Sequence, residues 1–219
     1  MIKNDIYALA RRIKYFLFLA GLFFVTVFIS ILMTEQVALH SRINQYHSPA
    51  ADIFFTYFSY LGDGMFAALL VIAGWFYNKD LAWRLLLAFL VTSLLVWVLK
   101  NFLFPGCARP LGVFEKEGLP LHLVKDVTVH KLHSFPSGHS TTAFMVFTAL
   151  SMVSKKAYVQ MLFAITAMLV AFSRVYLSQH FMEDIFAGGL LGTVTTFILF
   201  IPSLRLSPFR SSVKSVRTE

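Results

Sequence analysis

Cysteine and charged residues are scarce in this sequence. Cys107 is the single cysteine among 219 residues, so no disulfide bond can form within the chain and the redox compartment stays open. Charged residues make up 14% of the chain, whereas a soluble domain has about 25%. Hydrophobic residues make up 58%, and 24 of them are phenylalanine. A soluble fold of this length could not bury so much apolar surface, which predicts an integral membrane protein.

Internal repeats, low-complexity tracts and linkers are also missing, so we predict one domain over residues 1–219 with a core at about 60–200. No cleavable signal peptide is expected, because the first apolar run is too long and no A-x-A-like site follows it. Six apolar stretches approach the length of about 20 residues that a membrane-spanning helix needs. They cover residues 15–33, 53–77, 81–99, 138–154, 158–177 and 181–201. The sequence therefore predicts an all-α bundle of six transmembrane helices.

The net charge of +8 reflects basic residues near the termini and in alternate links. These residues are Lys3, Arg11, Arg12, Lys14, Lys79, Arg84, Lys155, Lys156, Arg205, Arg210, Lys214 and Arg217. The positive-inside rule then predicts that both basic tails are cytoplasmic. With the short links and small size, this favours a bacterial inner membrane. Nucleic-acid binding is not expected, because neither a basic duplex-reading face nor a known motif is present.

Two longer segments, residues 34–52 and 100–137, are predicted to lie outside the cell. The second segment is nevertheless basic, with Lys100, Arg109, Lys116, Lys125 and Lys131. An anion-binding site would explain this departure from the positive-inside rule. Lys100 and Arg109, followed by Pro110, suit phosphate oxygens, because lysine supplies a compact charge and arginine a planar fork. A snorkelling lysine and an ordinary loop arginine are the alternative.

A second motif, Pro136-Ser137-Gly138-His139, stands at the start of the fourth apolar stretch. Ser137 can cap a helix there, and Gly138 permits close approach to the backbone. The free N–H groups of a helix N-terminus attract anions, and His139 at the rim can donate a proton to a leaving oxygen. An ordinary cap with an interfacial histidine is the alternative.

The third motif places Ser173, Arg174, His180 and Asp184 within an apolar region. A charge at membrane depth costs about 2.5–3.5 kcal/mol, so such residues usually face a watery cavity and have a function. On a helix, His180 and Asp184 would share one face and could form a hydrogen bond. A histidine held by a carboxylate is a typical activated group. A polar pair that joins two helices is the alternative.

Other polar positions carry weaker signals. His122, His130 and His133 could suggest zinc, but their irregular spacing and the lack of a nearby cysteine favour solvated loop histidines. Asp63, between Gly62 and Gly64, can be structural or functional.

Two positions near the third motif concern packing. Glu183 should point about 100° away from Asp184, toward solvent or a loop. Gly188, Gly189 and Gly192 predict a seam of close helix packing.

Together the three motifs resemble those of the type 2 phosphatidic acid phosphatase (PAP2) family, membrane lipid phosphatases related to the vanadium haloperoxidases. The second and third motifs match the family pattern unaltered. The first has eight residues instead of six between Lys100 and Arg109. We expect the two extra residues to bulge out near Pro105-Gly106 and to leave Lys100 at the site. The resemblance covers residues of about 60–200.

The resemblance implies a role for each matched residue. His180 would attack phosphorus to form a phosphohistidine, Asp184 would hold its other ring nitrogen, and His139 would protonate the leaving group. The phosphoryl oxygens would be bound by Lys100, Arg109, Ser137, Gly138 and Arg174. No metal, other cofactor or obligate protein partner is implied.

The implied activity is hydrolysis of a phosphomonoester or diphosphate on a membrane lipid at the outer, periplasmic face. Phosphatidylglycerophosphate, phosphatidate, undecaprenyl diphosphate and lipid A phosphates are all compatible with the sequence. Transfer of the phosphate to another lipid is one alternative, and a lipid transporter or a non-catalytic scaffold is another. A transporter would more often show two related halves with broken helices, and these are not evident.

Overall fold

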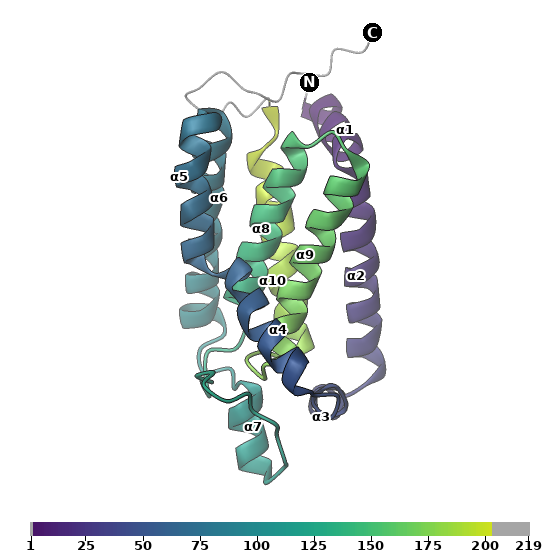
Figure 1. Cartoon of the computed structure of the whole chain (residues 1–219), viewed down its shortest axis with the longest axis vertical. Helices are drawn as coiled ribbons and strands as arrows, with labels where there is room; N and C mark the ends of the chain where they lie inside the picture. Colours follow the sequence, from purple (N-terminus) through teal and green to yellow (C-terminus); the bar gives the residue numbers. More distant parts are fainter. Residues whose placement is uncertain (1, 203–219) are drawn as a thin grey trace.

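The structure is a computed structural model that describes residues 2–202 (Figure 1). Its helices are α1 (Ile2–Arg12), α2 (Lys14–Met33), α3 (Gln36–Asn44), α4 (Pro49–Ser59), η1 (Tyr60–Gly62), α5 (Gly64–Tyr77), α6 (Lys79–Val98), η2 (Leu99–Leu103), α7 (Pro110–Glu117), α8 (Gly138–Val153), α9 (Ala157–Tyr176) and α10 (Met182–Leu199). No strand occurs within residues 2–202, which confirms the predicted all-α class. The predicted basic tail with Arg205, Arg210, Lys214 and Arg217 lies outside the described residues.

Four segments are long and apolar enough to cross a membrane as single helices, namely α2, α6 together with η2, α9 and α10. A fifth candidate is a bent pair, in which α4 and η1 meet α5 at an angle of 51°. The remaining predicted span corresponds to α8, which has 16 residues and is mostly buried inside the bundle. Length and composition of the described helices therefore support four or five spans, and the predicted number of six is not confirmed.

The predicted stretch 53–77 is broken at Asp63. The carboxylate of Asp63 caps α5, because its Oδ1 accepts a hydrogen bond of 2.9 Å from the N–H of Met65. Gly62 packs so closely that a Cβ there would lie 2.8 Å from the carbonyl oxygen of His139. The break is therefore fixed against the first turn of α8, at the level of the second predicted motif.

The predicted glycine seam joins α10 to its neighbours. A Cβ on Gly188 would lie 2.5 Å from the carbonyl oxygen of Ser137, and one on Gly192 would clash with the carbonyl of Thr141. This close approach lets the N–H of Ser137 donate a 3.0 Å hydrogen bond to the carbonyl oxygen of Asp184. The prediction of a close-packing seam is confirmed, and the seam brings the second and third motifs together.

The two ends of the bundle differ in composition. Figure 1 shows α1, the α5–α6 link and the α8–α9 link at one end, and α3 and α7 at the opposite end. The first end holds the basic residues Lys79, Lys155 and Lys156 together with those of α1. The second end holds the two segments that were predicted to face outward, and the three motifs meet beside them.

Candidate active site

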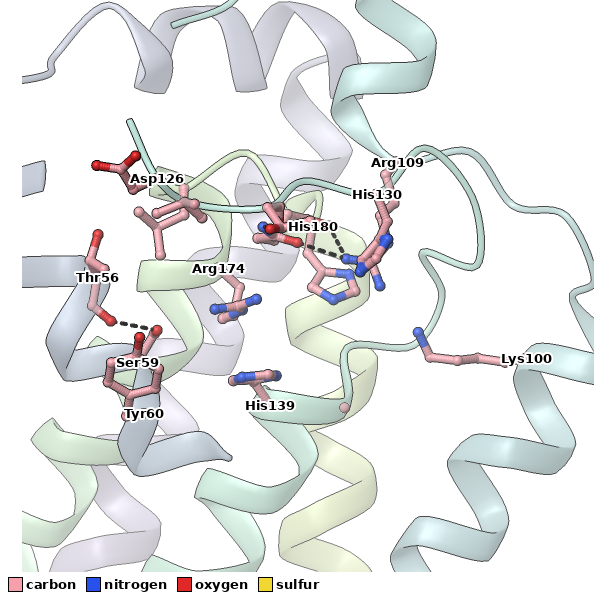
Figure 2. A pocket seen from close by; sticks show the side chains of 15 residues that line it. Thr56, Ser59, Tyr60, Lys100, Arg109, Asp126, His130, His139, Arg174 and His180 are labelled. Carbon is pink, nitrogen blue, oxygen red and sulfur yellow. Dashed lines mark hydrogen bonds between the residues drawn. The ribbon is translucent and has the colours of Figure 1, made fainter. Parts of the chain in front are cut away.

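A cavity of about 510 Å³ lies where the three motifs meet (Figure 2). Its wall includes Lys100 from η2, Arg109 before α7, Gly138 and His139 at the start of α8, Arg174 near the end of α9, and His180 before α10. Residues of α4 and of the segment 126–130 close the other side. Six of the eight predicted site residues therefore line one cavity, although they come from five different parts of the chain.

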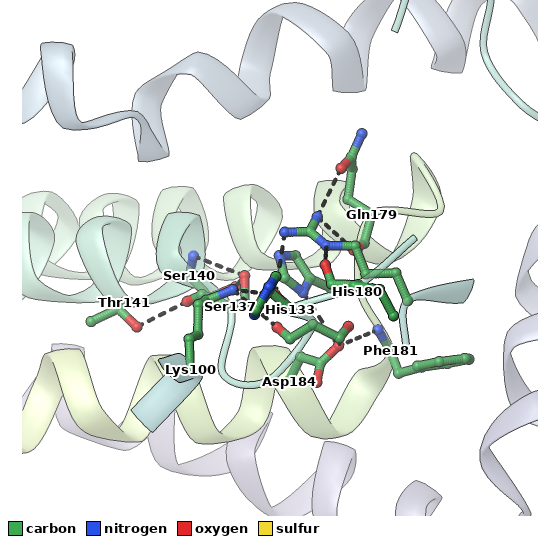
Figure 3. A network of polar contacts seen from close by, with 12 residues as sticks. Lys100, His133, Ser137, Ser140, Thr141, Gln179, His180, Phe181 and Asp184 are labelled. Atoms are coloured by element: carbon green, nitrogen blue, oxygen red, sulfur yellow. Dashed lines mark hydrogen bonds and ion pairs between the residues drawn. The ribbon is translucent and has the colours of Figure 1, made fainter. Parts of the chain in front are cut away.

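His180 and Asp184 form a buried pair beside this cavity. His180 Nδ1 lies 3.3 Å from Asp184 Oδ2, and the two residues are 2% and 4% exposed. Asp184 Oδ2 also accepts hydrogen bonds from Ser134 Oγ at 2.6 Å and from the N–H of Phe181 at 2.8 Å (Figure 3). Because Nδ1 faces the carboxylate, Nε2 is the nitrogen that remains for a substrate. Burial lowers the pKa of His180 to about 4 against the opposing effect of Asp184, so the imidazole is neutral at neutral pH.

The pair does not arise from one helix face. His180 lies in the turn after α9, and α10 begins only at Met182, with Phe181 as its N-cap. Asp184 is the third residue of α10, and its side chain folds back toward the start of the helix. The interpretation of a shared helical face was therefore wrong, and capping at the helix start brings the two groups together instead.

Three cationic side chains surround the cavity. Lys100 Nζ donates to the carbonyl oxygens of His133 and Ser134 at 2.5 and 3.4 Å. Arg109 donates from Nε to the carbonyl of Leu132 and from Nη1 to the carbonyl and the side-chain oxygen of Gln179.

Arg174 differs from these two, because its Nε is buried and has no hydrogen-bond partner among the described residues. Figure 2 shows its guanidinium group above the ring of His139 and to the left of that of His180. Arg174 lines the cavity, so an anion there would lie beside its guanidinium group, which makes the site complementary to phosphate.

The longer first motif is accommodated by two local features. The helix after α6 widens into η2, where the N–H of Phe104 donates to the carbonyl of Leu99, five residues earlier, at 2.8 Å. The chain then turns at residues 105–106, and Gly106 has φ of +77°, in the left-handed region that favours glycine. The turn lies at the position expected for the bulge, and Lys100 remains in the cavity wall.

Ser137 forms the predicted N-cap of α8. Its buried Oγ accepts hydrogen bonds from the N–H of Ser140 at 3.4 Å and from the hydroxyl of Ser140 at 2.9 Å. Gly138 lines the cavity, and apart from its own stretch of backbone no described heavy atom lies within 4 Å of the place where its Cβ would be. The open space at Gly138 lets a ligand approach the backbone. Ser137 is not in the cavity wall, and its contact with a phosphoryl group stays a prediction.

Sequence reasoning missed two residues that hold the site. Ser134 binds the carboxylate of Asp184 from a position two residues before the second motif. Gln179, directly before His180, accepts from Arg109 and donates from Nε2 to the carbonyl of Thr128 at 2.7 Å. Neither position had a signal of its own, because serine and glutamine are common in polar turns. Their proximity to the motifs was the only indication.

The loop histidines serve separate purposes. His122 stacks on His47, with ring centroids 3.7 Å apart, and its Nε2 lies 3.3 Å from Asp52 Oδ2. His130 lines the cavity, and the carbonyl of His133 accepts from Lys100. Across residues 2–202, no three His, Cys, Asp or Glu side chains are grouped so that they could hold a metal ion. His122 is therefore partly exposed, and it is held by contacts with His47 and Asp52.

Glu183 is exposed, as its angle from Asp184 suggested. It does not face a loop but stands at the wall of an apolar groove of about 560 Å³ between α2 and α10, where Phe28 and Phe186 are among its neighbours.

Comparison with known proteins identifies the family. The sequence profile of the PAP2 superfamily matches residues 81–205, which is more than half of the chain and includes all three motifs. The chain therefore belongs to the PAP2 superfamily, as the motifs predicted.

Two solved structures share the fold. The crystal structure of LpxE from Aquifex aeolicus superposes with a TM-score of 0.63 and 31% identity, covering 76% of this chain and 94% of that one. The PAP2-type phosphatidylglycerolphosphate phosphatase from Bacillus subtilis superposes with a TM-score of 0.59 and 25% identity, covering 92% of this chain and all of that one.

Two curated sequences match a shorter part of the chain. Phosphatidylglycerophosphatase B of Bacillus subtilis is 37% identical over 75 residues, and undecaprenyl-diphosphatase of Sulfolobus acidocaldarius is 38% identical over 66 residues. Each match covers 30% of this chain and about a third of the relative, at 37% and 32% of its length.

Proposed function

We propose that this protein is a membrane phosphatase that hydrolyses a phosphomonoester or diphosphate on a lipid through a phosphohistidine intermediate. One observation carries the proposal: a buried, neutral histidine held by a carboxylate stands in the same cavity as three cationic side chains. Phosphoryl transfer needs a positioned nucleophile and neutralisation of the equatorial oxygens, and this cavity supplies both. The relatives support the reaction class, since three of the four are phosphatases by name.

In the first step His180 Nε2 attacks phosphorus, and the bond from phosphorus to the leaving oxygen breaks. His139 gives its proton to that oxygen, so the lipid leaves as an alcohol or a shorter phosphate. Asp184 stabilises the positive charge on the phosphorylated imidazole through Nδ1. Lys100, Arg109 and Arg174 stabilise the charge on the equatorial oxygens. In the second step water attacks phosphorus, His139 takes its proton, and the P–N bond breaks to release inorganic phosphate and neutral His180.

The experiment is a phosphate-release assay on purified protein in detergent. The lipids are phosphatidylglycerophosphate, phosphatidate, undecaprenyl diphosphate and lipid A phosphates, each offered alone with and without EDTA. We expect release of inorganic phosphate from at least one lipid and no loss with EDTA, because side chains supply the positive charge. Loss with EDTA and recovery with magnesium or zinc would contradict the side-chain clamp. If the phosphoryl group appeared on a second lipid added as acceptor, with no release of inorganic phosphate, the protein would be a phosphotransferase. Binding without turnover would indicate a scaffold or transporter.

We further propose that α8 is the sixth crossing and that the cavity opens at the outer face of a bacterial inner membrane, with both termini cytoplasmic. The basic residues at the α1 end of the bundle support this orientation. Single cysteines at Pro120 and Lys155, introduced into a Cys107→Ser background, test it. In intact cells a membrane-impermeant thiol reagent should label position 120, and position 155 only after permeabilisation. The reverse pattern would place the cavity in the cytoplasm.

A further inference from the structure

Asp63 is a carboxylate beside the cavity to which the proposed reaction gives no role. It stands at the break between η1 and α5, in a segment that the three motifs do not include. Because Gly62 packs directly on the backbone of His139, the position of Asp63 is fixed relative to the first turn of α8. The two oxygens of its carboxylate have different surroundings. Oδ1 accepts from the N–H of Met65, and Oδ2 lies 3.9 Å from Nε2 of His139.

The charges around His139 indicate what the contact between Asp63 and His139 does. Three cationic side chains interact electrostatically with His139, namely Arg174 on α9, Arg109 before α7 and Lys100 on η2. Burial of the ring and these three charges all oppose a positive charge on the imidazole. A group that must donate a proton to the leaving oxygen, however, has to carry that proton when the substrate is bound. Without a nearby anion, the cations that bind phosphate would favour the deprotonated form of His139.

Asp63 approaches His139 from the N-cap of α5, on a different element from all three cations. Its carboxylate also interacts electrostatically with Arg174. The side chains of His139 and Asp63 are 32% and 43% exposed, and His139 lines the cavity. An opposite charge within about 4–6 Å favours the charged form of a histidine.

We propose that Asp63 is a positioning residue for the proton donor: its carboxylate holds His139 in the protonated form and aims it at the leaving oxygen. This inference rests on the proposed function, because it assigns to Asp63 a part in the first step of that reaction. It also predicts a specific dependence on the leaving group. A poor leaving group, such as the alkoxide of a lipid, needs the proton, whereas p-nitrophenolate leaves without it.

The experiment compares kcat/KM for phosphatidate in mixed micelles with kcat/KM for p-nitrophenyl phosphate, in the wild type and in Asp63→Asn. Asparagine caps a helix about as well as aspartate, so the start of α5 is preserved while the charge is removed. We expect Asp63→Asn to lose at least ~10-fold on phosphatidate and less than ~3-fold on p-nitrophenyl phosphate. On phosphatidate, the fall in kcat/KM at high pH should move to lower pH by at least ~0.5 unit, because the imidazolium has lost its counter-charge.

Two controls accompany this variant. Glu115→Gln removes one negative charge from an exposed ion pair with Lys131 at the same end of the bundle, and both substrates should keep wild-type rates. Asp63→Ala removes the cap as well as the charge, so any further loss relative to Asp63→Asn measures the structural contribution of the cap.

Equal losses on both substrates, as expected if Asp63 acted only through Arg174, would overturn the inference. So would a wild-type rate of Asp63→Asn on phosphatidate, or an unchanged pH profile. Failure of the proposed function looks different. In that case the wild type would hydrolyse neither substrate, or His180→Ala would hydrolyse both. Either result would also contradict the role of Asp63 as a partner of the proton donor.

Discussion

Arg84 and Arg174 lie near opposite ends of the same bundle, and both are buried, at 2% and 8% exposure. Arg84 is fully engaged: its Nε donates to both carboxylate oxygens of Asp80 at 3.1 and 3.3 Å, and Nη1 donates to the carbonyl of Leu199 at 2.9 Å. Its guanidinium also lies over the ring of Phe200. Arg174 has a buried Nε with no partner among residues 2–202, and it faces a cavity. Arg84 is therefore a cation that the fold uses for its own packing, whereas Arg174 borders a cavity that can hold a ligand.

The same contrast holds for two buried histidines, His180 and His40. His180 lines the cavity, whereas His40 packs between the rings of Phe114 and Phe181 and contacts Ser178 Oγ at 3.2 Å. The Nδ1 of His40 is also buried without a partner among the described residues, but it does not reach the cavity wall. An unpaired donor or acceptor therefore indicates a ligand site only where it borders a cavity.

The largest effect is expected from His180→Ala. Removal of the nucleophile should lower phosphate release by more than 100-fold, because loss of a covalent catalyst usually costs more than that. Size-exclusion chromatography and circular dichroism of the purified variant would show that it is folded. Retention of more than ~1% of wild-type turnover would rule out the covalent step.

Replacing each arginine by methionine should give opposite results. Arg174→Met should lower kcat/KM by at least 10- to 100-fold with little change in thermal stability, since charge-assisted contacts to phosphate are worth ~1.5–3 kcal/mol each. Arg84→Met should leave kcat/KM of the folded protein unchanged and cost ~3–5 kcal/mol of stability, because it removes one partner of a buried ion pair. If both variants lost activity in proportion to stability, the contrast between the two arginines would not hold.

Lys100→Met sharpens the comparison within the cavity. Lys100 has loop carbonyls as partners, so it is less available than Arg174, and we expect a 10- to 100-fold loss in kcat/KM. Arg109→Met should cost at least as much, because a guanidinium group can bind two oxygens. Full activity of Lys100→Met, with both arginine variants inactive, would leave Lys100 as an interfacial anchor. Lys116 or Lys131 would then be the next candidate for the third cation.

The smallest effect concerns His40. Burial lowers the pKa of His40 to about 4, whereas an unfolded histidine titrates near 6.5. Between these values the unfolded chain binds a proton that the folded chain does not, so stability falls as the pH drops through this window. This group should cost ~1 kcal/mol between pH 6.5 and 5.5. In His40→Phe, the pH dependence of the unfolding midpoint should be weaker and phosphate release should stay within ~3-fold of the wild type. An unchanged pH dependence would contradict the buried neutral state.

Sequence patterns predicted the helical class, and they predicted which residues come together at one cavity better than the local geometry of those residues. Motif spacing identified His139, Arg174 and His180, because these residue types are costly in an apolar region unless they face a cavity. The break at Asp63 was not predicted, since Gly62 and Gly64 are tolerated in membrane helices and the apolar stretch continues on both sides. The partner of Arg109 was also missed, because the contact with Gln179 depends on how two distant segments meet. Such contacts follow from tertiary packing and produce no periodic pattern in the sequence.

The glycine seam of α10 has a consequence for how the sequence can change over time. Gly188 and Gly192 touch no ligand, yet they set how closely α8 approaches α10, and with it the register between His139 and His180. A methyl group added at either position would move His139 relative to His180, because each glycine faces a backbone carbonyl that cannot yield. Natural variation at these two sites should therefore be as restricted as in the cavity wall. The lipid-facing surface, by contrast, should tolerate many more apolar substitutions.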